Sequence, residues 1–250
     1  MSEWNVRSSD VEAVLFDLGN TLVSYYRRTE FAPVLQRSIA AAAGALDLHR
    51  SRRGALGRPI DVAAATTLAQ RFNTERADSR VWPLADRLNQ IFEIADDEAT
   101  PELSAELAER FLEPIFDVAR VDESAVSVLQ RIRLLGKKTA IVSNTPWGSP
   151  GWRRELARHG LLDLVDTAVL CVDVGWRKPA PQIFAHTLET LDVAPSAALF
   201  VGDDPQWDIL GARRAGIAPV LLSATPSSGE CLRITQLEEL LPVLSSSPPR

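Results

Sequence analysis

A short apolar segment near the N-terminus, VEAVLF at residues 11–16, runs directly into the polar sequence DLGNT at residues 17–21. A brief, partly β-branched apolar run that ends in a polar loop is typical of a buried strand in a parallel sheet. Four further runs predict strands at residues 139–142 (TAIV), 168–172 (AVLCV), 197–201 (AALFV) and 219–222 (PVLL). Because helical segments separate these runs, the pattern predicts an α/β fold whose parallel sheet is covered on both faces.

The helical segments between the strands have recognisable ends. Asp122 is a candidate cap for a helix that closes at Gly136, and Pro179 or Pro181 can open a helix through residue 191. Residues 206–215 predict another helix, and the capping-box spacing of residues 235–238 predicts a last one.

The segment from residue 28 to residue 116 breaks the alternation of strands and helices. It is rich in Ala, Leu, Arg and Glu, and it predicts helices at residues 31–48, 62–76, 84–94 and 102–116. We therefore expect an all-helical module over residues 28–116, inserted after the first strand, and an α/β core built from residues 1–27 and 117–250.

Composition excludes several classes of protein. The 250 residues carry a formal net charge of −6, which argues against a nucleic-acid partner or an anionic membrane surface. No apolar run approaches the ~20 residues of a membrane span, and residues 1–10 lack the apolar core of a signal peptide. Cys171 and Cys231 match no metal or redox spacing, so we expect reduced thiols in a cytoplasmic protein. The oligomeric state stays open.

Polar side chains follow the predicted strands, at the edge where parallel α/β sheets bind ligands. They are Asp17, then Ser143 and Asn144, then Lys178 before a helix, and finally Asp203 and Asp204 with Asp208 further on. Each alone is an ordinary turn, cap or surface residue, but their order predicts that they converge on one crevice. Lys178 is also one of only three lysines among 27 basic residues.

This set of side chains suits phosphoryl transfer. Asp17 is the candidate nucleophile, since a carboxylate can take a phosphoryl group and split one displacement into two. Asp203 is a candidate Mg²⁺ ligand with Asp17, because the cation reduces repulsion between an anionic nucleophile and an anionic substrate. Lys178 can neutralise the same charge, and Ser143 with the Asn144 backbone N–H can bind the remaining phosphoryl oxygens.

Four ordered motifs extend these positions, namely FDLGNTL at 16–22, VSN at 142–144, KPAPQIF at 178–184 and VGDDPQWDI at 201–209, followed by GARRAG at 211–216. They resemble the motifs of the haloacid dehalogenase-like (HAD) hydrolase superfamily. The resemblance implies a Rossmann-like sheet of order 5-4-1-2-3 and a helical cap of the first type, inserted after the first strand.

The resemblance also implies individual roles. Asp17 would be nucleophile and metal ligand, position 19 would offer its carbonyl to Mg²⁺, and Asp203 would be a further ligand. Ser143, Asn144 and Lys178 would hold the phosphoryl group. Asp208 matches the second acid of the last motif and would order the water shell of the metal, although sequence does not separate it from Asp204.

One position departs from the phosphatase pattern. That pattern is Asp-x-Asp, and here Gly19 stands where the general acid/base is expected, a group typically worth ~10²–10⁴-fold in rate. The chain is therefore either a slow phosphatase, an enzyme for esters with good leaving groups, or one that takes an acid from the cap. The cap candidates are His49, Glu75, Asp78 and Tyr25.

Three functions follow. The first is a Mg²⁺-dependent phosphohydrolase acting on a small phosphorylated metabolite through an aspartyl-phosphate on Asp17. The second is a catalytically weak binding or partner protein, motivated by Gly19. The third is a 2-haloacid dehalogenase, since dehalogenases of this superfamily also lack the second Asp. The acidic residues Asp203 and Asp208 favour the first, because dehalogenases need no Mg²⁺.

Two groups of residues, one of tryptophans and one of arginines, each allow two interpretations. Trp147, Trp176 and Trp207 either pack against neighbouring loops or line the space for a leaving group. Arg50, Arg52, Arg53 and Arg58 form either a solvated face or a phosphate-gripping patch on the cap.

Overall fold

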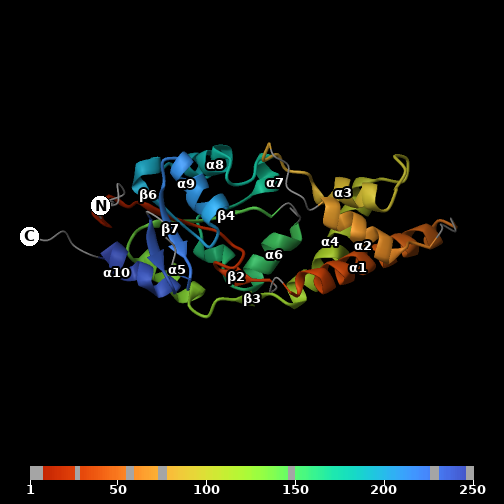
Figure 1. The fold of residues 1–250 in the computed structure, drawn as a ribbon, viewed down its shortest axis with the longest axis horizontal. Helices are drawn as coiled ribbons and strands as arrows, with labels where there is room; N and C mark the ends of the chain where they lie inside the picture. The colour runs from red at the N-terminus through yellow and green to blue at the C-terminus, as the bar shows by residue number, and fades with distance from the viewer. Residues whose placement is uncertain are drawn as a thin grey trace, which may run out of the picture. The chain divides into compact units, whose positions relative to one another are not determined.

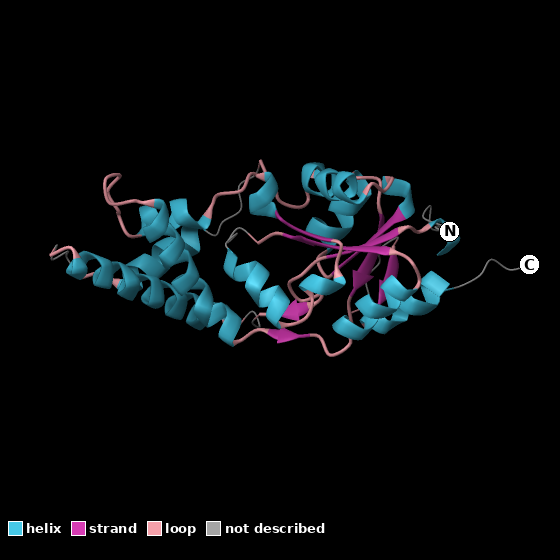
Figure 2. Ribbon diagram, turned by 180° about the vertical axis from the view of Figure 1, so that it is seen from behind, coloured by secondary structure: helices cyan, strands magenta, loops and turns pink. Residues whose placement is uncertain are grey.

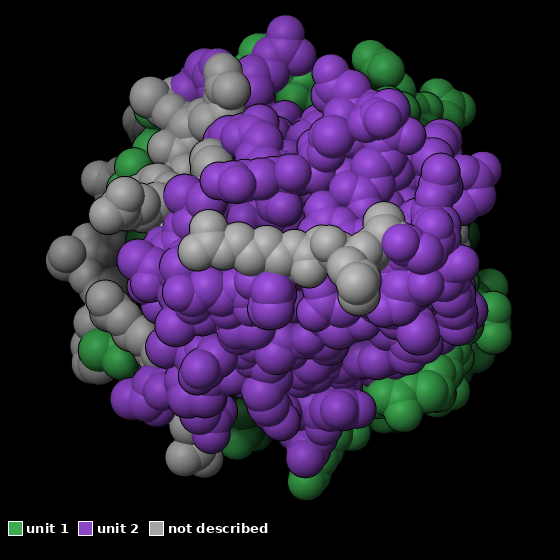
Figure 3. All heavy atoms as spheres, turned by 90° about the vertical axis from the view of Figure 1, so that its right-hand side faces the viewer, with its two compact units in different colours: residues 1–24, 121–145, 156–250 green, residues 25–120, 146–155 purple. Residues whose placement is uncertain are grey.

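The computed structural model describes residues 8–25, 29–54, 59–72, 78–145, 150–225 and 231–245. The chain divides into two compact units, coloured separately in Figure 3. Unit 1 comprises residues 1–24, 121–145 and 156–250, and unit 2 comprises residues 25–120 and 146–155.

Unit 1 is built on a six-stranded parallel sheet in the order β5-β4-β1-β6-β7-β8 (Figure 1). The predicted Rossmann-like α/β class is confirmed, and the five predicted strands lie in the predicted order. A sixth strand that the sequence analysis does not predict, β8, extends the sheet beside β7. The strands are β1 (Ala13–Phe16), β4 (Lys138–Ser143), β5 (Thr167–Leu170), β6 (Ala198–Gly202), β7 (Ala218–Leu222) and β8 (Leu232–Ile234).

The first strand lies at the centre of the sheet because it is apolar on both faces. All four residues of β1 are buried, and its last residue, Phe16, lies opposite Ile141 of β4 and Val201 of β6. A strand with no polar face must be covered on both sides. This register brings the carboxyl ends of β1, β4 and β6 to one edge, directly before Asp17, Asn144 and Asp203.

Helices cover both faces of this sheet (Figure 2). The helices α8 and α9 pack against each other on one side, and α5 and α10 pack together on the other (Figure 1). Short 3₁₀ turns are η1 (Ser8–Asp10), η2 (Leu162–Leu164), η3 (Pro195–Ala197) and η5 (Leu237–Glu239), and η4 (Pro205–Ile209) is a π-helical turn. The α-helices are α5 (Ala125–Leu134), α7 (Cys171–Val174), α8 (Pro181–Leu191), α9 (Leu210–Arg214) and α10 (Leu240–Ser245).

Two predicted elements of unit 1 change type within their predicted bounds. The strand predicted at residues 168–172 ends at Leu170, because the Asp173 side chain accepts the Leu170 N–H at 3.0 Å and a helical turn follows. The helix predicted at residues 206–215 is divided into the π-helical turn η4 and the short helix α9.

Unit 2 is mainly helical. Its helices are α1 (Phe31–Arg52), α2 (Val62–Phe72), α3 (Leu84–Ile91) and α4 (Pro101–Asp117), with the first part of α6 (Pro150–Arg158). The long helix α1 packs along α4, and α4 buries Leu107, Phe111 and Leu112 on one face. Thr100 caps α4, since its hydroxyl accepts the Leu103 N–H at 3.3 Å and Pro101 follows at the first helical position. Two short strands, β2 (Val23–Ser24) and β3 (Arg120–Val121), lie where the chain passes between the units.

Candidate active site

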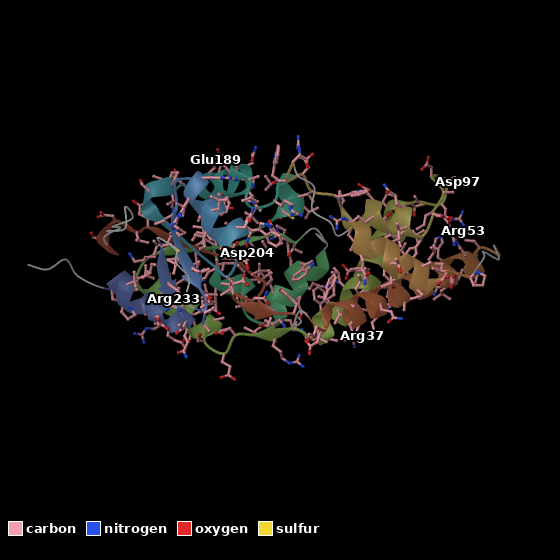
Figure 4. All side chains as sticks on the ribbon, viewed as in Figure 1. Arg37, Arg53, Asp97, Glu189, Asp204 and Arg233 are labelled. Atoms are coloured by element: carbon pink, nitrogen blue, oxygen red, sulfur yellow. The ribbon has the colours of Figure 1, made fainter. Side chains whose placement is uncertain are left out.

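The predicted site residues of unit 1 meet at the carboxyl edge of the sheet. Asp17 follows β1, Asn144 follows β4, and Asp203 follows β6. Lys178 comes from the loop before α8, and Asp208 comes from η4, which also follows β6. Figure 4 labels Asp204, which lies between Asp203 and η4.

Lys178 bridges two carboxylates in the interior of this edge. Its Nζ lies 2.5 Å from Asp17 Oδ1 and 2.7 Å from Asp208 Oδ1, and the lysine is only 2% exposed. The ammonium also lies 5.2 Å from the centre of the Phe200 ring. A buried ammonium needs such partners, because burial without them is costly. Lys178 is thus an internal cation rather than a solvated surface lysine.

The electrostatics of this cluster favour a further cation. Burial raises the pKa of Asp17 to about 7 and outweighs the lowering effect of Lys178, while Asp208 and Asp203 raise it further. For Lys178, burial alone would lower the pKa, but the charges of Asp17 and Asp208 raise it above its usual value, so the ammonium stays protonated. The single positive charge of Lys178 therefore does not balance the negative charges of the carboxylates around it.

Three carboxylates come close enough to share one metal ion. Oxygen atoms of Asp17, Asp203 and Asp208 all lie within 4.8 Å of one another. Burial first, and then the charges of Asp208 and Asp204, raise the pKa of Asp203 to about 6. Hard oxygen ligands with excess negative charge fit Mg²⁺, which prefers a few carboxylates together with carbonyls and water.

The structure separates the two acids that the sequence leaves equivalent. Asp204 caps the turn η4, since its Oδ1 accepts the N–H groups of Gln206 at 2.7 Å and Trp207 at 2.8 Å. Asp208 instead turns inward and is 2% exposed, and its Oδ2 accepts the Asp204 N–H at 3.1 Å. Asp208 is therefore the acid that belongs to the carboxylate cluster.

Gly202 makes this inward position available. A Cβ atom built at residue 202 would overlap Cβ, Cγ and Oδ2 of Asp208. A residue with any side chain would therefore have to push the Asp208 carboxylate away from its place beside Lys178.

The residues after β4 make contacts that sequence reasoning missed. The hydroxyl of Ser143 lies 2.8 Å from that of Thr145, and both residues are buried. The side chain of Asn144 is bonded to the backbone of Lys178 at both its oxygen and its nitrogen. Thr21, also unpredicted, donates to Asp17 Oδ2 at 3.4 Å. The only signal for these threonines in the sequence is their position: Thr145 directly follows Asn144, and Thr21 lies two residues after Gly19.

Gly19 is half-buried and forms an isolated bridge with Val23. Its carbonyl stays a predicted metal ligand. Of the acids considered as replacements, His49, Asp78 and Tyr25 belong to unit 2, and Glu75 lies outside the described residues. Tyr25 packs edge-to-face on Trp152 at 5.1 Å, and Phe116 packs on the same tryptophan at 5.0 Å.

The tryptophans near the predicted motifs lie in different settings. Trp207 is half-buried, and the guanidinium of Arg177 lies 5.7 Å above its ring, a cation–π distance. Trp176 is half-buried, and Trp147 lies outside the described residues.

Unit 2 has a cavity of its own, of about 880 Å³, lined mainly by the C-terminal ends of α1 and α3 and by α2. Arg50 and Arg53 line it, together with the acids Asp61, Glu93, Asp97 and Glu98 (Arg53 and Asp97 are labelled in Figure 4). Arg50 is held by Glu98 in two bonds of 2.8 Å each. Of the two interpretations of these arginines, this pairing does not favour a phosphate-gripping patch, and Arg58 lies outside the described residues.

The chain belongs to the haloacid dehalogenase-like hydrolases. The model of that family matches residues 11–216, a range that contains every predicted site residue of the core. The resemblance and the hydrolase class predicted from the sequence motifs are thereby confirmed.

Individual relatives divide between two chemistries. The chain is 33% identical over 194 residues to a phosphoserine phosphatase of Thermus thermophilus, covering 72% of this chain and 74% of that protein. In structure it is similar to a HAD phosphatase of Thermococcus onnurineus and to a 2-haloacid dehalogenase of Pseudomonas syringae. Each has a TM-score of 0.66 and 24% identity, covering 94% of this chain and 98% of the other. Fold alone therefore does not separate phosphatase from dehalogenase.

Proposed function

We propose that this protein is a Mg²⁺-dependent phosphohydrolase that acts on a small phosphorylated metabolite through an aspartyl-phosphate on Asp17. The observation that carries the proposal is the cluster of Asp17, Asp203 and Asp208 around Lys178. The phosphoserine phosphatase relative supports the same chemistry.

The cluster also favours this function over dehalogenation. Displacement of a halide needs a carboxylate nucleophile but no metal, so the nearby charge of Asp203, which forms no ion pair with Lys178 among the described contacts, would add repulsion. A phosphoryl substrate is itself anionic, and carboxylates that bind a cation are then useful. Asp17, Asp203 and Asp208, with the Gly19 carbonyl, would hold Mg²⁺, which when bound would offset the charge of nucleophile and phosphoryl group.

The residues of this chain would carry the following steps. An oxygen of Asp17 attacks phosphorus, the bond to the leaving-group oxygen breaks, and water then hydrolyses the acyl phosphate to restore the carboxylate. Lys178 stays beside the Asp17 carboxylate as a fixed positive charge throughout. The buried hydroxyl of Ser143 and the backbone N–H of Asn144 would donate to the phosphoryl oxygens.

The two-part organisation of the chain also enters the proposal. We assign residues 28–116 as an inserted helical cap of the first type and residues 1–27 and 117–250 as the core. Asp17, Lys178, Ser143 and Asn144 would contact the phosphoryl group, so the choice of substrate would depend on other residues.

A phosphate-release screen over a panel of small phosphate esters, with Mg²⁺ and with EDTA, tests the function. We expect release that requires Mg²⁺ and is lost in Asp17→Asn, which keeps the shape of the side chain but not its charge. An Asp17→Asn variant with wild-type rates would refute the mechanism. Release of chloride from a 2-haloacid, unaffected by EDTA, would establish dehalogenation instead. Binding of metal and phosphate without turnover of any ester would favour the catalytically weak alternative that Gly19 motivates.

A further inference from the structure

The side chain of Asn144 forms a reciprocal pair of hydrogen bonds with the backbone of Lys178. Asn144 Oδ1 accepts the Lys178 N–H at 2.7 Å, and Asn144 Nδ2 donates to the Lys178 carbonyl at 3.0 Å. The backbone partners distinguish donor from acceptor, so the pair also fixes which amide atom is oxygen. The contact joins residues 34 positions apart in the chain.

Residues 175–180, here called the lysine loop, contain no helix or strand to hold Lys178, and only Trp176 forms an isolated β-bridge. They lie between α7 and α8, and a turn bond from Ala180 N–H to the Arg177 carbonyl at 3.0 Å closes them locally. Asn144 instead follows Ser143, the last residue of β4, a strand paired on both sides. Its amide therefore ties the lysine loop to the rigid carboxyl edge of the sheet, much as a neighbouring strand would.

The position of the Lys178 ammonium depends on this backbone. A lysine side chain has four rotatable bonds and loses considerable rotamer freedom when it is fixed. Here its Nζ must reach both Asp17 Oδ1 at 2.5 Å and Asp208 Oδ1 at 2.7 Å. A shift of the loop would disturb both contacts at once, since both are made by the same nitrogen atom.

We propose that the Asn144 side chain is a positioning residue, which holds the lysine loop against β4 and so places the Lys178 ammonium between Asp17 and Asp208. This role is distinct from the binding of a phosphoryl oxygen by the Asn144 backbone N–H. Asn144 Oδ1 and one N–H of Nδ2 are engaged with Lys178, so the positioning role needs no contact between this side chain and a ligand.

The scarcity of lysine makes this inference testable without any enzyme assay. Lys137, Lys138 and Lys178 are the only lysines, so acylation by acetic anhydride followed by peptide mass spectrometry distinguishes Lys178 from the adjacent pair Lys137 and Lys138. Lys178 is 2% exposed and should react slowly in the wild type. In Asn144→Ala we expect acylation of Lys178 to rise about tenfold through local opening of the loop, with Lys137 and Lys138 unchanged.

Asp166→Ala is the matched control. Its carboxylate accepts the Thr139 N–H at 2.7 Å, a side-chain bond to the backbone near the other end of β4. It should lower the melting temperature without changing the acylation of Lys178. If Asn144→Ala does not fold, Asn144→Asp keeps the acceptor for the Lys178 N–H and should give a smaller rise. Unchanged Lys178 acylation in the folded variant, an equal rise at all three lysines, or the same rise in Asp166→Ala would each overturn the inference.

A second, kinetic test of the role of Asn144 rests on the proposed phosphohydrolase function. With para-nitrophenyl phosphate, Asn144→Ala should lower kcat about tenfold, whereas in a Lys178→Met background the same change should cost less than about twofold. Additive losses would mean that Asn144 does not act through Lys178. A wild type without phosphatase activity would refute the proposed function alone, because the acylation result does not depend on turnover.

Discussion

The carboxylate of Asp208 lies against the backbone of Gly202, in the space that a Cβ atom at residue 202 would occupy. The same carboxylate reaches Lys178 Nζ at 2.7 Å and belongs to the cluster with Asp17 and Asp203. The last residue of β6 thus makes room for an acid six positions further along the chain. Gly202 is part of the site although it offers no functional group.

Replacing Gly202 tests this dependence. Gly202→Ala should displace Asp208 and weaken Mg²⁺ binding about 10–100-fold, the usual cost of disturbing a group that supports a metal site. Titration of Mg²⁺ by calorimetry measures the effect. Gly44→Ala is the control, because a Cβ there meets nothing within 4 Å and residue 44 lies inside α1. That change should leave Mg²⁺ binding unaltered and add up to ~1 kcal/mol of stability. Equal Mg²⁺ affinity in Gly202→Ala would contradict the close packing.

The neighbouring acids Asp204 and Asp208 should respond differently to the same substitution. Asp208→Asn removes a buried charge from the cluster, so we expect loss of phosphatase activity. Asp204→Asn keeps an oxygen that can accept from Gln206 and Trp207, so activity should stay within about threefold of wild type. Measurements of kcat/KM for both variants test this expectation. A larger loss in Asp204→Asn than in Asp208→Asn would show that the capping acid, Asp204, is the functional one.

Much of this site is predictable from local sequence. Asp17, Lys178 and Asp203 stand at the ends of recognisable strands or beside a helix start, and parallel strands bring such positions together. The separate roles of Asp204 and Asp208 are not predictable this way, because they depend on the π-helical turn that Asp204 caps and that contains Asp208. The contact of Asn144 with Lys178 cannot be predicted from the sequence either, since it depends on how the lysine loop packs against β4. The strand β8 was missed because it is short, and two of its three residues are exposed.

The effect of Mg²⁺ on stability should depend on pH. Without metal, the pKa values of Asp17 and Asp203 are raised to about 7 and about 6, both from 3.8. The folded state then binds these protons more tightly than the unfolded chain, so the stability they contribute declines as pH rises from ~4 to ~7. Metal ligands must be deprotonated, so Mg²⁺ competes with protons at low pH.

We therefore expect the Mg²⁺-induced rise in melting temperature to be larger near pH ~8 than near pH ~5.5. Differential scanning fluorimetry with and without Mg²⁺ measures it. Asp17→Asn should show a smaller rise at both pH values, because one ligand charge is missing. A rise that is the same at both pH values in the wild type would argue against metal binding by these carboxylates.

Gly19 is the position where an added side chain should improve the enzyme. No carboxylate stands two residues after Asp17, so we expect the wild type to favour esters whose leaving group needs no proton, and kcat/KM to fall steeply as the leaving-group pKa rises. Gly19→Asp would place a proton carrier there and should raise kcat/KM for alkyl phosphates by up to ~10²-fold, with little gain for aryl phosphates. A series of esters of graded leaving-group pKa measures how kcat/KM depends on that pKa in the wild type and in Gly19→Asp. Gly19→Asn, similar in shape to Gly19→Asp but without the acid, is the control. If the wild-type slope is already shallow, another group protonates the leaving group, and variants of His49, Asp78 and Tyr25 would then identify it.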